Sequence, residues 1–228
     1  MHVYSKQSNF AIVNSNGIYM GKIHRFYRRG RHPRGFWGRR ALIAMNGKKH
    51  EALPEWVFGQ LPLEDGLRIL DIGCGGGGNI RRLLERCPKG HVTGLDISKL
   101  AVEMTTDENY PAVKDGLCLV VGGNAVQMPL AKDIFDIAFA FETIYYWSTI
   151  DGGFAEAYRV LKPGGTLVIA NELDGLCPDD EILARRVGAM RIYTPDEIEM
   201  SLREAGFTDI TIDRDEKRHF LYATAKKS

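Results

Sequence analysis

A run of glycines that joins a predicted strand to a predicted helix constrains this chain more than any other feature. In residues 70–80, LDIGCGGGGNI, an apolar segment ends in an acid and continues directly into glycines. Residues 68–72 are typical of a buried strand, and helical spacing resumes over residues 80–86. Glycine permits the positive φ of a tight turn, and the bare N–H groups at a helix start bind polar or anionic groups. The pattern therefore predicts the seat of a nucleotide-like cofactor.

The acid before the glycines indicates the charge of that cofactor. Gly73, Gly75 and Gly78 fit G-x-G-x-x-G, a spacing that also occurs in pyrophosphate-binding turns. Asp71 precedes the first of them by two positions, where its charge would repel a pyrophosphate and attract a cation. The segment from Asp71 to Gly77 resembles motif I of the class I S-adenosylmethionine-dependent methyltransferases. In that family the acid lies near the ammonium of the methionine part, with the glycines beneath it. The alternative is a glycine-rich turn in which Asp71 only caps the helix.

From Arg68 onward, predicted strands alternate with predicted helices, which indicates a parallel sheet with right-handed crossovers. Strands are predicted at residues 68–72, 91–95, 117–121, 134–141 and 165–170. Helices are predicted at residues 79–87, 99–108, 151–161, 181–188 and 195–205. An antiparallel pair, 207–213 and 220–225, closes the chain around a turn at 213–217.

The segment YRVLKPGG at residues 158–165 also matches the methyltransferase family, before its fifth strand. The resemblance implies an α/β fold, a three-layer α-β-α Rossmann-like sandwich. Its seven-stranded, mostly parallel sheet would have the strand order 3-2-1-4-5-7-6, with an antiparallel last strand. We expect residues 61–228 to form this catalytic domain and residues 1–60 to form a helical and loop extension with lid helices.

The extension carries a basic segment. Residues 22–40 contain eight basic residues and no acid, interleaved with aromatic side chains. Its glycines and proline predict an irregular loop to about Arg39, followed by helices at 40–45 and 51–58. Three interpretations stay open, in this order: a cap over the active site that pairs an anionic substrate with arginine, a solvated extension on an acidic body, and a nucleic-acid patch. Met45, Asn46 and His50 resemble a lid region, although a lone histidine is more often structural.

Polar residues at the ends of the second and third strands complete the predicted cofactor site. Asp96 can accept two hydrogen bonds from a ribose diol, or else cap the next helix. Asn124 stands where the family usually has an Asp that pairs with the adenine amine; its amide oxygen can accept the same bond, or else form an ordinary turn. The cofactor-binding residues expected from the pattern and the resemblance are Asp71, Gly73, Cys74, Gly75, Asp96, Ile97, Asn124, Ala125 and Glu142.

An acid and an aromatic cluster follow the fourth strand, where the resemblance places methyl transfer. Aromatic faces attract a sulfonium charge, and a carboxylate can accept a proton or hold a cation. The candidate catalytic residues are Glu142, Tyr145 and Tyr146, and packing in the core is the alternative for the two tyrosines and Trp147. No two-histidine-plus-carboxylate set has ligand spacing, so we expect no metal.

Composition excludes several classes of protein. The four cysteines are widely spaced without C-x-x-C, which indicates free thiols in a reducing compartment. The N-terminus has no apolar signal region, and no apolar run is long enough to span a bilayer. The chain is therefore expected to be cytoplasmic, with no membrane partner.

These features together predict an S-adenosylmethionine-dependent methyltransferase that acts on a small-molecule acceptor and releases S-adenosylhomocysteine. Three alternatives remain: an RNA methyltransferase that docks through Lys22–Arg40, a non-catalytic cofactor-binding module, and a dinucleotide oxidoreductase, which Asp71 disfavours. Nucleic acid is disfavoured further because the Asn/Asp-Pro-Pro-aromatic signature of amino-methylating enzymes is missing. A homodimer is left open. The sequence names neither the acceptor nor the methylated atom.

Overall fold

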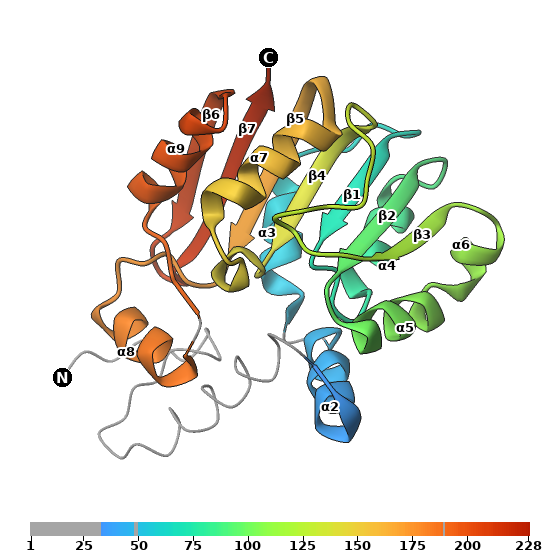
Figure 1. Cartoon of the computed structure of the whole chain (residues 1–228), viewed down its shortest axis with the longest axis horizontal. Coiled ribbons are helices and arrows are strands. Elements are labelled where there is room, and N and C mark those ends of the chain that lie inside the picture. The colour runs from blue at the N-terminus through green and yellow to red at the C-terminus, as the bar shows by residue number, and fades with distance from the viewer. Residues whose placement is uncertain (1–32, 48–49, 189) are drawn as a thin grey trace.

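The structure, a computed structural model, describes residues 33–47, 50–188 and 190–228 (Figure 1). Its strands are β1 Arg68–Ile72, β2 His91–Asp96, β3 Cys118–Gly122, β4 Phe135–Phe141, β5 Leu161–Asn171, β6 Phe207–Asp215 and β7 Phe220–Lys227. Its helices are α2 Gly35–Met45, α3 Ala52–Gln60, α4 Gly78–Arg86, α5 Lys99–Glu108, α6 Tyr110–Lys114, the 3-10 turn η2 Ile144–Tyr146, α7 Ile150–Val160, α8 Pro178–Val187 and α9 Pro195–Glu204.

The seven strands form one sheet in the order β3-β2-β1-β4-β5-β7-β6. Neighbouring strands from β3 to β5 pair in parallel, whereas β7 is antiparallel to both β5 and β6. Helices α7 and α9 cover one face of the sheet, and α3 and α4 lie behind the other (Figure 1). The predicted Rossmann-like sandwich, strand order and reversed seventh strand are confirmed.

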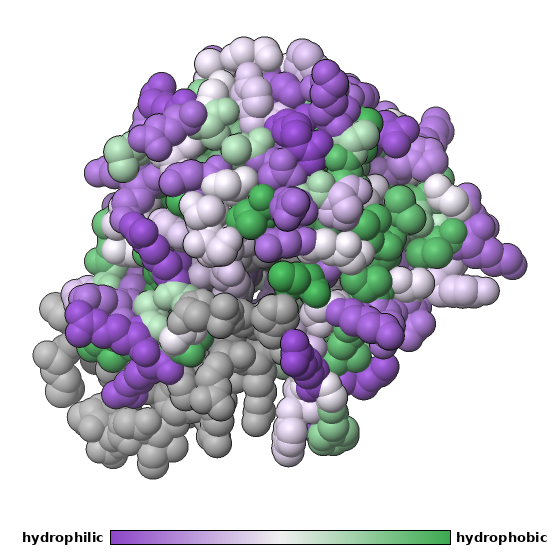
Figure 2. Space-filling model, in the orientation of Figure 1, coloured by the Kyte–Doolittle hydropathy of each residue, from purple (hydrophilic) through white to green (hydrophobic). Residues whose placement is uncertain are grey.

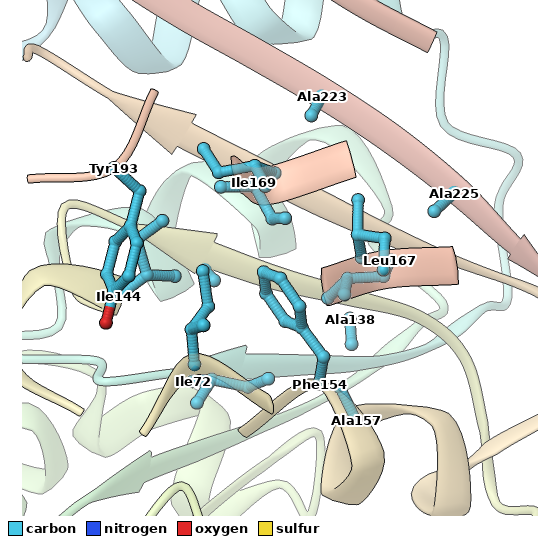
Figure 3. Close-up of a cluster of buried hydrophobic side chains, with 14 of the residues drawn as sticks. Ile72, Ala138, Ile144, Phe154, Ala157, Leu167, Ile169, Tyr193, Ala223 and Ala225 are labelled. Carbon is cyan, nitrogen blue, oxygen red and sulfur yellow. The ribbon is translucent and has the colours of Figure 1, made fainter. Parts of the chain in front are cut away.

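Alternate side chains of the strands pack into a hydrophobic core on each face of the sheet. In β1, Leu70 and Ile72 belong to the cluster under α7 and α9, whereas Ile69 belongs to the cluster under α3 and α4. Phe154 of α7 points into the first cluster beside Ile72 (Figure 3). Because a strand alternates its faces, the continuous apolar run of β1 is what a strand covered on both sides requires.

The extension before the sheet differs from the sequence prediction. Residues 35–39, expected as an irregular loop, form the first turns of α2. A Cβ on Gly38 would lie 2.7 Å from the Pro33 carbonyl carbon, so this glycine allows the chain to fold closely on itself rather than ending the helix. Helix α3, expected as part of a lid, buries Leu53 and Val57 in the core.

Two further differences concern the ends of elements. Strand β5 begins at Leu161 rather than Gly165, because Leu161 pairs with Phe135 of β4. The last turn lies at residues 216–219, because β6 continues pairing to Asp215. Neither change moves the edge of the sheet where the glycine turn lies.

Candidate functional site

The carboxyl ends of β1, β2, β3 and β4 meet at one edge of the sheet and border a cavity of about 610 Å³. Parallel α/β sheets bind ligands at this edge. The predicted site residues that line the cavity are Gly73, Gly75, Asp96, Ile97, Asn124, Ala125, Glu142, Tyr145 and Tyr146. Cys74 lines a smaller cavity of about 70 Å³, which shares Gly73, Gly75 and Glu142 with the larger one. Asp71 lines neither.

The glycine turn forms the floor between the two cavities. Gly73 has φ +81°, and a Cβ there would overlap the side chain of Thr143. Gly75 has φ +56°, and a Cβ there would meet nothing closer than Leu42 Cδ2 at 3.8 Å. Since Gly75 and Leu42 both line the large cavity, a side chain at Gly75 would fill space that a ligand can occupy.

Asn46 at the end of α2 fixes the other side of the turn. Its Nδ2 donates to Gly76 O at 2.6 Å, and its Oδ1 accepts from Gly78 N at 3.1 Å. A Cβ on Gly76 would lie 2.7 Å from Asn46 Oδ1, so this contact requires glycine. The lid region suggested by the sequence therefore touches the turn through Asn46, a residue that was not among the predicted site residues.

Asp96 connects the turn to the next strand. Its Oδ2 accepts from Gly75 N at 3.0 Å, and its Oδ1 accepts from Ser98 N at 2.8 Å. Ser98, rather than Asp96, is the N-cap of α5. These backbone bonds hold the carboxylate at the cavity wall, and each oxygen retains a further lone pair for a hydroxyl group.

The far end of the cavity combines an exposed apolar side chain with a tight turn. Ile97 is 51% exposed, beside Asn124 and Ala125 in the cavity wall. Asn124 Oδ1 accepts from Val126 N at 3.2 Å, which is the turn role that the sequence had left as its alternative. Its amide nitrogen and the second lone pair of its oxygen can still form hydrogen bonds to a ligand.

Asp71 lies buried behind the glycine turn. Neither carboxylate oxygen has a hydrogen-bond partner among the described residues. Burial raises the pKa of Asp71 to about 7, and the charge of Asp96 adds to the rise. Because a buried carboxylate without a partner is costly, this region favours a positively charged ligand over an anionic one.

A further pair of acids, half-buried Glu142 and buried Glu172, lines the small cavity, and Glu142 also lines the large one. Glu142 has φ 55°, a strained value for a residue other than glycine, and it follows directly after β4. Its Oε1 accepts from Tyr145 Oη at 3.1 Å and from the backbone N–H of Glu172. Burial, and then the charge of Glu172, raises the pKa of Glu142 well above its usual range. His50 Nδ1 lies 3.8 Å from Glu172 Oε1.

A cationic group also lines the small cavity. Arg82 of α4 has a nearly buried side chain, and its Nη1 donates to Asn79 Oδ1 at 3.1 Å. Its Nη2 lies 3.3 Å from Glu51 Oε1 without making a hydrogen bond. The first turn of α4 contains no acid, and Gly78 and Asn79 line this cavity. A helix start and an arginine together favour a carboxylate.

The three aromatic residues after β4 all line the large cavity, and Tyr145 is also part of the core. Tyr145 is 1% exposed, and its hydroxyl accepts from Leu173 N at 3.0 Å, so it packs in the core and holds Glu142. Tyr146 and Trp147 lie in the wall. Trp147 packs on Phe154 of α7, with ring centroids 5.8 Å apart.

We expect Gly153→Ala to displace Trp147 from the cavity wall. A Cβ at Gly153 of α7 would overlap the Trp147 ring. Overpacking of this kind costs about 1–3 kcal/mol, more than the ~1 kcal/mol that alanine gains in a helix. Chemical denaturation should show lower stability, and tryptophan fluorescence should shift. The matched control is Gly59→Ala in α3, where a Cβ would meet nothing within 4 Å. Equal stability changes in both variants would contradict this packing.

The segment between α8 and α9 also reaches the cavity, which the sequence did not indicate. Met190, Arg191 and Tyr193 line it, and Arg191 N donates to Tyr145 O at 2.9 Å. Arg191 Nη2 is paired with Glu197 Oε1 at 2.8 Å. The residues sit just before the capping box of α9, a pattern that predicts a helix start but no contact with a distant strand edge.

Groups typical of metal centres or membrane spans do not occur in the described part of the chain. Residues 33–47, 50–188 and 190–228 contain no group of three or more His, Cys, Asp or Glu side chains placed to hold a metal ion. Over the same ranges, every helix is too short or too polar to cross a bilayer.

The parallel sheet, its glycine-floored cavity and the acid at the end of β2 define an α/β protein that binds a nucleoside cofactor. A family model described as a methyltransferase domain matches residues 70–169. The O-methyltransferase rstn1 of Aspergillus nomiae is 31% identical over 161 residues, which are 69% of this chain and 71% of that protein. The chain belongs to the class I S-adenosylmethionine-dependent methyltransferases, and its cofactor is S-adenosylmethionine.

Two further relatives match this chain over only part of their own length. The 27-O-demethylrifamycin SV methyltransferase of Amycolatopsis mediterranei is 34% identical over 68% of this chain and 58% of its own length. The 24-methylenesterol C-methyltransferase 2 of Arabidopsis thaliana is 35% identical over 54% of this chain and 35% of its own length. The chain thus spans about a third to three fifths of these two proteins.

A solved structure shares the fold. An S-adenosylmethionine-dependent methyltransferase from Aquifex aeolicus superposes with a TM-score of 0.68 at 20% identity. The superposition covers 82% of this chain and 97% of that one.

Proposed function

We propose that this protein transfers a methyl group from S-adenosylmethionine to a small-molecule acceptor. The observation that supports this most is the pairing of two opposite charges around the small cavity, with Asp96 in the adjoining large one. Glu142, Glu172 and Arg82 all line the small cavity. An amino-acid tail carries an ammonium and a carboxylate, so it matches both kinds of charge at once, whereas a diphosphate would meet two acids.

We assign the residues as follows. Asp96 would bind the ribose diol, while Ile97 and Ala125 cover the base and Asn124 meets its edge. Arg82 and the start of α4 would bind the carboxylate of the tail. Asp71 would act through its field from behind the turn, because it does not reach the wall.

The bound cofactor supplies a methyl group on a positively charged sulfur. The chain's own task is then to align an acceptor and exclude water, and alignment contributes up to roughly 7–11 kcal/mol. Tyr146 and Trp147 would shield the cavity and offer ring faces to positive charge.

Glu142 is our candidate for accepting a proton from the acceptor. Burial and the charge of Glu172 raise the pKa of Glu142, and a nearby positive charge would lower that pKa and favour the carboxylate form. We assign Tyr145 as a positioning residue, because its hydroxyl donates to Glu142 Oε1 and accepts from Leu173 N. General base catalysis typically contributes about 10²–10⁴-fold, less than alignment can.

Small-molecule acceptors are supported by the names of the relatives. Those names describe C-methylation of a sterol and O-methylation of a rifamycin. Both names describe small-molecule acceptors, and Tyr146, Trp147, Met190 and Tyr193 give the large cavity an apolar and aromatic lining that could hold one.

We expect Arg82→Gln to weaken cofactor binding through the tail alone. A charge-assisted hydrogen bond contributes about 1.5–3 kcal/mol, so affinity for S-adenosylhomocysteine should fall about 10–150-fold. Adenosine, which has no tail, should bind the variant and the parent equally. Calorimetry with both ligands measures this. A matched control is Arg81→Gln, since Arg81 of the same helix is half exposed and pairs with Glu85 and Glu108. Equal losses for the two ligands would contradict the assignment of Arg82.

Methyl-labelled S-adenosylmethionine incubated with the full chain and a cell metabolite extract tests the function. We expect label in compounds of low molecular mass, identified by mass spectrometry, and none with Asp96→Ala. Label recovered in RNA would favour the nucleic-acid alternative. Tight cofactor binding without labelled product across a broad acceptor panel would favour a non-catalytic module.

A further inference from the structure

We propose that the outer face of α2 docks this protein onto an anionic lipid surface. The inner face of the helix is buried through Gly38, Ala41 and Leu42, where Leu42 packs with Ala101 and Met104 of α5. Phe36 and Ile43 lie on the opposite side, seven residues apart, and are 67% and 57% exposed. Large apolar side chains left in water on one helix face indicate a binding surface.

Within α2 and its N-cap, every charged residue is positive. Arg39 and Arg40 are exposed on the same outer face, and Arg34 is exposed at the N-cap. The Arg40 guanidinium lies 5.8 Å from the centre of the Phe36 ring. Residues 33–47 contain no acidic residue, and the printed sequence from Lys22 to Arg40 contains none either. A face that combines apolar side chains with arginines, without acids, complements a surface of apolar chains and negative head groups.

The basic segment lies in the described structure only from residue 33, and residues 22–32 lie outside the described residues. For the described part, the geometry of α2 disfavours the other interpretations. Leu42 and Met45 point to the cavity wall, so Phe36 and Ile43 on the opposite side do not cover the site. A nucleic-acid surface would use the arginines and stack bases on Phe36, but Ile43 has no ring to stack. A purely solvated face would gain nothing from either apolar side chain. A lipid surface would contact all four side chains, the apolar Phe36 and Ile43 and the basic Arg39 and Arg40.

The position of α2 would bring the cavity close to the lipid surface. The helix projects from the sheet edge that holds the cavity, and its surface shows apolar and polar groups side by side (Figures 1 and 2). Because the same helix lines the cavity with Leu42 and Met45, docking its outer face would hold the cavity close to the lipid. The inference does not depend on methyl transfer. It replaces the expectation of no membrane partner, which rested only on the lack of a spanning segment.

Vesicle flotation of the full chain tests the proposal. We expect the chain to float with vesicles that contain phosphatidylglycerol, to stay behind with pure phosphatidylcholine, and to be released by high salt. Arg39→Gln/Arg40→Gln should lower partitioning about 25-fold, at about fivefold for each arginine. Phe36→Ser/Ile43→Ser should lower it about tenfold or more.

Two controls keep the result specific. Met200→Ser and Arg203→Gln change an exposed apolar and an exposed basic residue of α9, and they should partition like the parent. Thermal melts and S-adenosylhomocysteine binding should be unchanged in every variant, since none of the altered residues lines the cofactor cavities. The proposal is overturned if the chain ignores anionic vesicles, if the α2 variants bind them like the controls, or if RNA binds in their place.

Discussion

Asp71→Asn should weaken S-adenosylmethionine binding about tenfold or more and, above pH 7, stabilise the ligand-free protein. Folding raises the pKa of Asp71 from 3.8 to about 7, because of burial first and the charge of Asp96 second. Between about pH 4 and 7 the folded state therefore keeps a proton that the unfolded state has released, so stability falls as pH rises through this window. The cost approaches about 4 kcal/mol at 1.36 kcal/mol per pKa unit. A nearby cation offsets that cost, which is why binding and stability should move in opposite directions.

Thermal melts and calorimetry at pH 5 and pH 8 measure both effects. At pH 8 the ligand-free variant should melt above the parent, and at pH 5 closer to it. Affinity of the parent for the cationic cofactor should rise with pH through about 7, and the variant should lose the part of this rise that Asp71 provides. Asp107→Asn, an exposed acid on α5, is the control. Parent-like affinity in Asp71→Asn would refute the electrostatic role of this acid.

Asp96→Ala should reduce cofactor affinity about 100-fold or more. Two hydrogen bonds to a charged group contribute about 1.5–3 kcal/mol each, and the change would remove both bonds to the ribose diol. It would also leave the N–H groups of Gly75 and Ser98 without their acceptor, which loosens the turn. The loss should therefore appear with adenosine as well as with S-adenosylhomocysteine, unlike that of Arg82→Gln.

Asp96→Asn separates the two roles of this side chain. Its remaining oxygen can still accept a backbone N–H, so the melting temperature should stay closer to that of the parent than in Asp96→Ala. Its affinity should still fall, because an amide offers the diol one acceptor and no charge. If Asp96→Ala bound S-adenosylhomocysteine as tightly as the parent in calorimetry, the diol assignment would be wrong.

Local sequence patterns predicted most of the helices and strands. The apolar run of β1, the glycines after it and the capping box of α9 each determine their own structure, and the resemblance supplied the strand order. The pairing of Asp96 with Gly75 also follows from sequence, because adjacent parallel strands bring their carboxyl ends together.

Contacts set by distant register could not be predicted in this way. Glu172 meets Glu142 because β4 and β5 pair with Phe141 beside Ala170, and nothing in either segment alone indicates that register. Arg82 is polar within a strongly amphipathic helix, so its sequence suggested an exposed side chain, yet it is nearly buried. The sequence suggested that Gly38 interrupts a helix. Its close packing on Pro33 depends on the path of the chain, which the local sequence does not show.

Calorimetric titration of the full chain at pH 8 with S-adenosylmethionine, S-adenosylhomocysteine and NAD tests most directly whether charge around the glycine floor selects the cofactor. All three ligands carry an adenosine, so they differ chiefly in what the small cavity would meet. We expect saturable heat for the first two ligands and none for NAD. Saturable binding of NAD, with no heat from either sulfur compound, would contradict the cofactor and the function that depends on it.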